Sequence, residues 1–307
     1  MRPSFKLETI AFVALAFRTA AARPAPADLP CARCHPAETA GYATTQMAHS
    51  LGRVTREPSG DFVHAASKTH FWVESGGSAT GWPMTQRLER HGVSGDYVPA
   101  YALGSGSHAV AYLIDLDGHL FQSPLCFYPG RGWDMAPGYE ENRQPDFLRP
   151  VTAECLSCHA GKARPVAGSL NRYEDPPFEA EAITCERCHG SAEAHLRSPL
   201  PGSIINPAKL SERARDSICE QCHLSGEARI LNPGKQFSDF QPGPDLEQVF
   251  SVYIFAGSRD PTQAGALKVI SQAQQLALST CARRSNGKLW CGTCHDPHQQ
   301  PADPKSW

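Results

Sequence analysis

The sequence has no excess of basic residues, and this limits its possible partners. The 307 residues carry a formal net charge of −2 at pH 7, so charge gives no reason to expect a nucleic acid as partner. Beyond the N-terminus, no apolar run is long enough to cross a membrane. We therefore expect no nucleic-acid partner and no stable membrane span after cleavage of a signal peptide.

Hydrophobic residues are also somewhat scarce for a chain of this size, at 41%. Pro (26) and Gly (25) together make up about a sixth of the residues, which predicts much loop and few long regular elements. Something other than aliphatic side chains is therefore expected to fill part of the interior.

The first thirty residues, MRPSFKLETIAFVALAFRTAAARPAPADLP, have the order of a secretory signal peptide. Arg2 and Lys6 precede a short apolar run at 10–17, and small residues follow before Arg23. An N-terminal membrane anchor is the alternative, although the apolar run is short for a bilayer span. We expect a periplasmic or otherwise exported protein that is cleaved near Ala22.

Ten of the twelve cysteines repeat one pattern, C-x-x-C-H. A zinc knuckle or a redox dithiol can imitate one copy, but neither requires a histidine after the second cysteine each time. The pattern is the attachment signature of c-type haem, in which the two thiols hold the haem and the histidine binds its iron. The copies are Cys31, Cys34 and His35; Cys155, Cys158 and His159; Cys185, Cys188 and His189; Cys219, Cys222 and His223; and Cys291, Cys294 and His295. We therefore expect five covalently attached haem c groups.

Five haems would supply the apolar interior that the side chains lack. We expect a mainly α-helical and irregular multihaem cytochrome c packed around stacked haems. A small antiparallel β insertion is expected at about 60–130, because Asp117-Gly118 is a hairpin signal between two β-prone runs; an irregular loop region is the alternative. The expected parts are a signal peptide at 1–22, a segment with the first haem and the β insertion at 23–150, and a region with four haems at 151–307.

Each iron has a second axial position, and eight histidines lie outside the motifs. His195 and His298 follow the third and fifth motifs closely, so we expect each to bind an iron, that of a neighbouring haem. His108 lies in a glycine-rich stretch that lets the backbone approach a porphyrin, and His64 is a further candidate. Surface positions are expected for His49, His70, His91 and His119.

Longer stretches around the motifs resemble a known family. They are CERCHGSAEAHL, IINPAKLSERARDSICEQCHLSG, DFQPGPDL, STCARRSNGKLWCGTCHDPH, ALGSGSHAVAYLIDLDGHLFQSPLCFY and WDMAPGYE. They are similar to segments of exported multihaem cytochromes c related to the tetrahaem cytochrome c of nitrifying bacteria. In that family the first motif is usually followed by Trp-x-x-Ser-x-His-Ala, whose histidine is a distal ligand. Met47 stands in that position here, so the resemblance implies Met47 as a ligand, with His49 as the substitute; alternatively, Met47 only packs on the porphyrin and the iron is five-coordinate.

Two cysteines, Cys126 and Cys281, lie outside the motifs. In similar sequences a cysteine precedes the last motif, so we do not expect Cys281 to bind haem. A Cys126–Cys281 disulfide is one alternative in an oxidising compartment, and two free buried thiols are the other. Relatives commonly continue into a further haem motif or into tetratricopeptide repeats, which makes a repeat protein a possible partner.

Three functions are compatible with these features. The first, which we favour, is electron transfer between redox protein partners or quinol-linked donors, with all irons six-coordinate. The second is a multihaem oxidoreductase that keeps one haem open for a small nitrogen compound or a peroxide. The motif C-x-x-C-K of ammonia-forming nitrite reductases is missing, which disfavours nitrite reduction specifically. The third is a redox-sensing or scaffold module. No catalytic residue is assigned.

Overall fold

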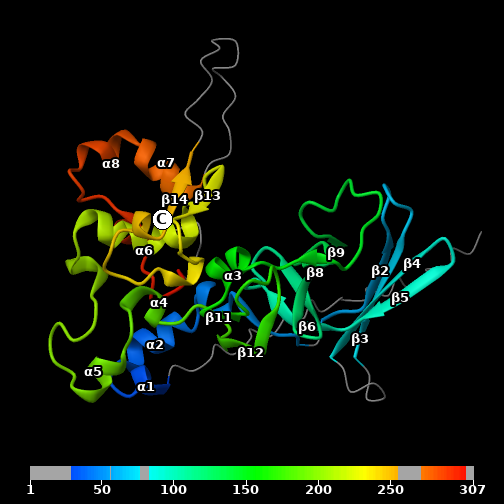
Figure 1. The fold of residues 1–307 in the computed structure, drawn as a ribbon, viewed down its shortest axis with the longest axis horizontal. Coiled ribbons are helices and arrows are strands. Elements are labelled where there is room, and N and C mark those ends of the chain that lie inside the picture. Colours follow the sequence, from blue (N-terminus) through cyan, green and yellow to red (C-terminus); the bar gives the residue numbers. More distant parts are fainter. Residues whose placement is uncertain (1–28, 56, 77–82, 255–270, 302–307) are drawn as a thin grey trace, which may run out of the picture.

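A computed structural model describes residues 29–55, 57–76, 83–254 and 271–301. The predicted signal peptide at 1–22 lies outside the described residues. Figure 1 shows an elongated molecule with strands at one end and short helices at the other. Strands account for about 30% and helices for about 27% of the structure. The predicted fold class, mainly helical and irregular with a small β insertion, is therefore wrong.

Two antiparallel sheets form the strand-rich part of the molecule. The larger sheet has the order β1-β6-β7-β8-β10, with β9 also paired to β8, and the smaller one is a meander of β2 to β5. The larger sheet consists of β1 (Leu51–Arg53), β6 (Pro99–Leu103), β7 (Val110–Leu116), β8 (His119–Tyr128), β9 (Gly132–Met135) and β10 (Arg149–Pro150). The smaller sheet consists of β2 (Gly60–Val63), β3 (His70–Ser75), β4 (Met84–Arg90) and β5 (Val93–Tyr97).

The β region is larger than predicted, and the larger sheet is covered on both faces. Tyr112 and Ile114 on β7 belong to an apolar cluster that includes Phe71 of the smaller sheet. Leu113, between them, belongs to a second cluster together with Leu156 of a helix. Side chains alternate between the two faces of a strand, so the apolar run of β7 fills two cores at once. The apolar residues of the chain are thus concentrated here, where side chains alone build the interior.

The predicted turn at Asp117-Gly118 is confirmed. Both residues have positive φ, 51° and 80°, and Leu116 pairs directly with His119 across β7 and β8. Two positive φ values match the right-handed twist of the flanking strands. The sequence Asp-Gly tolerates them because glycine has no Cβ and aspartate is among the residues that visit this region.

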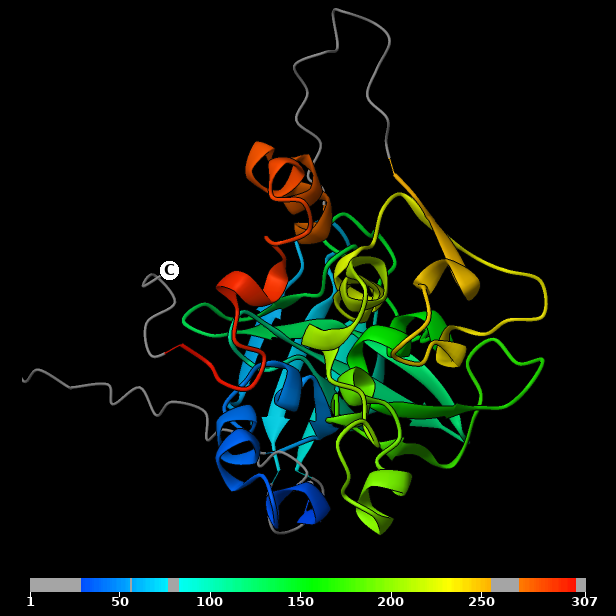
Figure 2. The same ribbon diagram turned by 90° about the vertical axis from the view of Figure 1, so that its left-hand side faces the viewer.

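The helix-rich part has short elements and little apolar core of its own. Figure 2 shows these helices in front of the sheets. None of the three apolar clusters found in the described residues includes a residue of α1, α2 or α4 to α9. The α-helices are α1 (Leu29–Ala32), α2 (Pro36–Tyr42), α3 (Ala153–His159), α4 (Glu186–His189), α5 (Glu193–Arg197), α6 (Glu212–His223), α7 (Gln272–Leu278), α8 (Thr280–Arg284) and α9 (Cys291–Cys294). This part therefore fits the expectation that another apolar group completes its interior.

Two hairpins and four 3₁₀ turns complete the described structure. The hairpin of β11 (Lys162–Pro165) and β12 (Tyr173–Ala180) packs on the larger sheet through Phe178. The hairpin of β13 (Ala228–Leu231) and β14 (Phe250–Tyr253) lies near the helices (Figure 1). The 3₁₀ turns are η1 (Met47–His49), η2 (Pro207–Lys209), η3 (Phe237–Asp239) and η4 (Leu246–Gln248). No helix in the described ranges has the length and apolarity of a membrane span.

The two cysteines outside the motifs lie in different parts of the molecule. Cys126 is buried in the larger sheet, where its thiol donates to the carbonyl of Val110 at 3.1 Å. Burial raises the pKa of this thiol to about 11. Cys281 is exposed on α8, and neither cysteine forms a disulfide. The structure therefore has two free thiols, of which one is buried.

Candidate haem sites

Each C-x-x-C-H motif lies on, or directly continues, a turn of helix. The main-chain N–H of His35 donates to the carbonyl of Cys31 at 2.8 Å, and the third and fifth motifs make the same bond at 2.9 Å. The second motif ends α3 and the fourth ends α6. Residues three apart share a face of a helix, so both thiols of a motif are presented to one side. This is the arrangement that attachment of one haem through two thioethers requires.

The second and fourth motifs contact each other through their cysteines. Cys158 Sγ lies 3.7 Å from the carbonyl of Gln221, and Cys222 Sγ lies 3.9 Å from that of Ser157. A hydrogen bond with Cys222 lowers the pKa of Cys158 to about 5, and Arg229 adds to this effect. Once both sulfur atoms are thioethers, neither titrates. What persists is that the two attachment sites are in direct contact.

The fourth motif also contacts the fifth and the third. A hydrogen bond between Cys219 and Cys291 lowers the pKa of Cys291 to about 7 and raises that of Cys219. The side-chain amide of Gln221 donates to the carbonyl of Arg187, inside the third motif, at 3.1 Å. Four of the five motifs thus form one connected group with α6 at its centre.

Two of the predicted distal histidines lie opposite motif histidines. The ring centroids of His35 and His195 are 6.4 Å apart, and those of His189 and His298 are 5.8 Å apart. Two imidazoles on opposite sides of one metal ion have centroids about 6 Å apart, given metal–nitrogen bonds of roughly 2 Å. Both pairs therefore have the spacing that a shared haem iron requires, and each pairs one motif with a ligand from another segment.

Hydrogen bonds fix the ring nitrogens of two of these histidines. Nδ1–H of His189 donates to the carbonyl of Ile205 at 2.8 Å, which leaves Nε2 with a lone pair. His195 Nδ1 lies 2.8 Å from the hydroxyl of Ser203, which itself donates to the carbonyl of Leu200. Ser203 therefore accepts from Nδ1–H of His195. A metal-binding histidine usually donates its second ring N–H in this way, so both rings keep at Nε2 the lone pair that a metal ligand needs.

The histidine of the second motif differs from these in its surroundings. Burial lowers the pKa of His159, which favours the neutral imidazole that binds metals. The hydroxyl of Ser50 donates to the carbonyl of His159 at 2.8 Å. Within the described residues, neither His159 nor His223 forms a ring pair with a second histidine.

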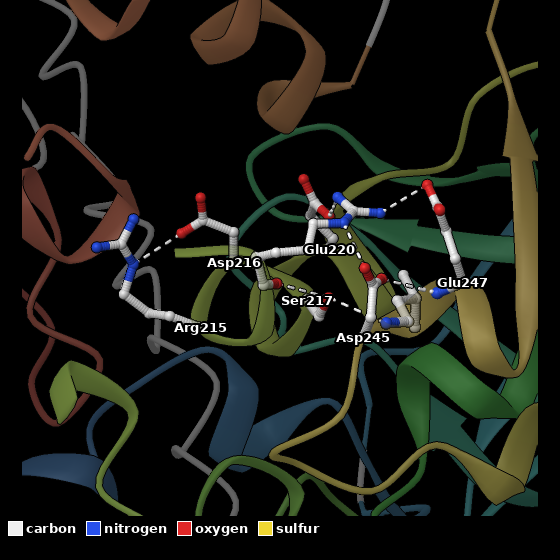
Figure 3. Close-up of polar contacts among 8 residues, drawn as sticks. Arg215, Asp216, Ser217, Glu220, Asp245 and Glu247 are labelled. Carbon is white, nitrogen blue, oxygen red and sulfur yellow. Dashed lines mark hydrogen bonds and ion pairs between the residues drawn. The ribbon is translucent and has the colours of Figure 1, made fainter. Parts of the chain in front are cut away.

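An ion-pair network holds the central helix α6 in place (Figure 3). Arg213 contacts Glu220 at 2.9 Å, Asp245 at 3.0 Å and Glu247 at 2.9 Å. The main-chain N–H of Leu246 donates to the buried hydroxyl of Ser217 at 3.0 Å. These contacts attach α6 to η4, so the fourth motif is positioned by residues more than twenty positions away from it in sequence.

The structure places His64 away from the motifs, within the strand-rich part. Its side chain is buried, Nε2–H donates to the carbonyl of Glu140 at 2.7 Å, and Nδ1 lies 2.8 Å from the hydroxyl of Ser67. Both ring nitrogens are thus used by the protein. His64 thus has the contacts of a structural histidine, and its role as an iron ligand stays a prediction.

Met47 and His108 both lie near the second motif. Met47 is half-buried in η1 and stands three residues before Ser50, the partner of His159. His108 is exposed in the loop after β6, and the N–H of Gly104 at the start of that loop donates to the carbonyl of Ser50 at 2.7 Å. His49 donates Nε2–H to the carbonyl of Ala43 at 2.8 Å, while its buried Nδ1 has no partner among the described residues. Ser50 therefore links the segments that carry these three candidate ligands to the second motif.

Sequence reasoning missed the residues that orient the ligands. Ser203 and the carbonyl of Ile205 lie outside every motif, and a backbone carbonyl leaves no signal in a sequence. Ser203 is the last residue of a Pro-rich stretch, SPLPGS, that predicts only a loop. The orienting contacts become visible only when the chain is folded.

These features are typical of one class of protein, the multihaem c-type cytochromes. Residues 137–190, which contain the second and third motifs, match the family described as cytochrome c554 and c-prime. The match confirms the predicted resemblance over this segment. It supports covalent haem c as the cofactor and electron transfer as the chemistry.

Two solved structures align with the chain at low identity. The outer cell wall cytochrome OcwA aligns at 16% identity with a TM-score of 0.46, over 74% of this chain and 44% of that one. An undecaheme cytochrome from the S-layer of Carboxydothermus ferrireducens aligns at 14% identity with a TM-score of 0.34, over 67% of this chain and 33% of that one. This chain thus spans less than half the length of either structure. No curated protein sequence matches it.

Proposed function

We propose that this chain is an exported pentahaem cytochrome c that carries electrons between redox partners. When bound, haem iron takes up and releases single electrons. The chain holds each haem by one C-x-x-C pair and binds its iron through the adjacent histidine. His195 completes the first site and His298 the third. Met47, His49 or His108 completes the second.

The observation that carries this proposal is the contact group around α6. The second, third and fifth motifs each contact the fourth through a cysteine or a main-chain carbonyl. The pair of His35 and His195 then connects the first motif to the helix that follows the third. Attachment sites in direct contact support a continuous path for electrons, and this is what a carrier needs.

Export is supported by the N-terminal sequence and by the chemistry of attachment, because c-type haem is attached outside the cytoplasm. We infer a redox protein or a quinol-linked enzyme as donor. A separate repeat protein remains a candidate partner on the resemblance alone.

A second candidate function is catalysis at an open haem. One observation favours it: within the described residues, the ring of His223 is not paired with a second histidine, whereas those of His35 and His189 are. An iron without a protein ligand on one side binds a small nitrogen compound or a peroxide.

One set of measurements on the holoprotein separates the two functions. The haem-to-protein ratio is expected to be five, and the low-temperature electron paramagnetic resonance spectrum of the ferric protein is expected to show low-spin signals only. On a graphite electrode, a carrier gives reversible waves that nitrite, hydroxylamine and hydrogen peroxide leave unchanged. A high-spin signal, together with a catalytic current when one of these compounds is added, would contradict electron transfer as the function and support catalysis at an open haem.

A further inference from the structure

Three arginines around the contact group each leave one buried N–H without a hydrogen-bond partner in the described structure. The atoms are Arg187 Nε, Arg215 Nη2 and Arg229 Nε. A buried donor on a charged group is costly to leave unpaired, and proteins rarely do so. An acceptor is therefore needed at three places around the haem motifs.

Each of these guanidinium groups is held in position by its other nitrogens. Arg187, inside the third motif, donates from Nη2 to the carbonyl of Ser157 in the second motif at 2.7 Å. Arg229 on β13 donates from Nη2 to the carbonyl of Gln221 in the fourth motif at 2.9 Å. Its guanidinium carbon lies 4.3 Å from the ring centroid of Phe250. The unpaired N–H groups are thus fixed donors rather than ends of mobile side chains.

Arg215, beside the fifth motif, is also held in position by its other nitrogens. It lies on α6, pairs with Asp216 at 2.8 Å and donates from Nη1 to the carbonyl of Gly287 at 3.2 Å. Its guanidinium carbon stands 4.7 Å from the ring centroid of Trp290, the residue before Cys291. Its side chain is 11% exposed, so water has little access to the remaining N–H.

A carboxylate is the acceptor that fits these donors in charge. In the described part of the chain, Arg187 and Arg229 form no ion pair with a protein carboxylate, although guanidinium groups prefer such partners. Each haem carries two propionates. We propose that Arg187, Arg215 and Arg229 bind haem propionates at the second to fifth motifs, an inference that rests on the proposed haem attachment.

This role has an electrostatic consequence. A fixed positive charge at a propionate offsets its negative charge, which otherwise stabilises the ferric iron. The arginines therefore raise the reduction potentials of the haems that they contact. They are positioning and tuning residues and do not bind iron.

The test is a potentiometric titration of the holoprotein, followed by its optical spectrum. Arg229→Gln and Arg215→Gln are each expected to lower the midpoint potential of at least one haem. Arg229→Lys and Arg215→Lys keep the charge and are expected to keep most of the potential. Arg90→Gln is the matched control, because Arg90 Nη1 is also buried and unpaired but belongs to β4 in the strand-rich part.

Two results would overturn the proposal. Midpoint potentials unchanged in both glutamine variants would exclude contact with the propionates, and equal decreases in the glutamine and lysine variants would assign the effect to packing. If a glutamine variant fails to accumulate, the proposal is tested on the unmodified protein. Its arginines are labelled with a nitrogen isotope, and infrared difference spectra are recorded between the oxidised and reduced haems. Arginine bands that change with haem oxidation are expected, and their absence counts against the proposal. Haem content and spin state, which test the proposed function, are expected to stay constant throughout.

Discussion

The imidazole rings of His189 and His298 are nearly parallel, with centroids 5.8 Å apart and planes inclined by 22°. His189 ends the third motif, whereas His298 follows the fifth. On the proposed ligand assignment, the segment that follows one haem motif completes the iron site of another. Removing such a ligand leaves one iron five-coordinate and does not change the thioether bonds of its haem. The ligand assignments can therefore be tested one by one.

His298→Ala is expected to convert one haem from low-spin to high-spin. The iron would keep His189 and lose its second strong ligand, so about a fifth of the low-spin intensity should disappear if five haems are bound. Low-temperature electron paramagnetic resonance of the ferric protein measures this. His91→Ala, at the exposed turn between β4 and β5, is the control. An unchanged spectrum in His298→Ala would remove His298 from the ligand set.

His195→Ala is expected to open the haem of the first motif in the same way. Ser203→Ala is the informative companion, because it removes the acceptor of Nδ1–H but leaves the imidazole. Loss of this bond lowers the basicity of the ligand and loosens its orientation. We expect the haem to stay low-spin in Ser203→Ala with a shifted midpoint potential, seen by combined resonance spectra and titration. A high-spin haem in Ser203→Ala, or none in His195→Ala, would contradict the assignment.

Ser217→Ala is expected to destabilise the protein by about 1–3 kcal/mol, because the buried N–H of Leu246 would lose its acceptor. The effect should be seen as a lower unfolding temperature in circular dichroism at an unchanged haem-to-protein ratio. Ser94→Ala, on the exposed face of β5, provides the comparison. Equal unfolding temperatures for the two variants would show that the link between α6 and η4 contributes little.

The haem motifs could be predicted from sequence because their chemistry is written in five consecutive residues. That His195 and His298 lie close to motif histidines could also be predicted, because each follows a motif closely in the chain; that they bind iron stays a prediction. The Asp117-Gly118 turn belongs to the same group, since φ preferences are local.

The sheets could not be predicted in full because their pairings are distant in sequence. Leu51 pairs with Leu103 and Arg149 with Gln122, and nothing in segments of two or three residues indicates such partners. The sequence of β7 also does not show that both of its faces are buried, because a short apolar run is compatible with a strand or with a helix. Only the packing of the folded chain shows it. The low apolar content predicts that haems fill part of the interior, but it does not indicate that the apolar side chains are concentrated in the strand-rich part.

His64 gives the last prediction, because its contacts in the structure are those of a structural histidine, whereas the sequence favours an iron ligand. A histidine beside Phe62 and Val63 gave no local indication that its partner would be the carbonyl of Glu140, 76 positions away. His64→Ala would leave that carbonyl and the hydroxyl of Ser67 without this ring, at a cost of about 1–3 kcal/mol. For a chain of this size, each kcal/mol lowers the unfolding temperature by roughly 2–4 °C.

The two roles of His64 give opposite results. If His64 has a structural role, His64→Ala is expected to lower the thermal stability and to leave the low-spin spectrum unchanged. Circular dichroism and electron paramagnetic resonance on the same sample measure these two properties. If His64 binds an iron, His64→Ala is expected to show a new high-spin signal. His70→Ala is the matched control, because His70 lies on β3 and its partly exposed ring contacts Asp61 at 3.0 Å and the ring of Trp72. A high-spin signal in His64→Ala but not in His70→Ala would restore His64 as a ligand and would require that Glu140 moves when haem binds.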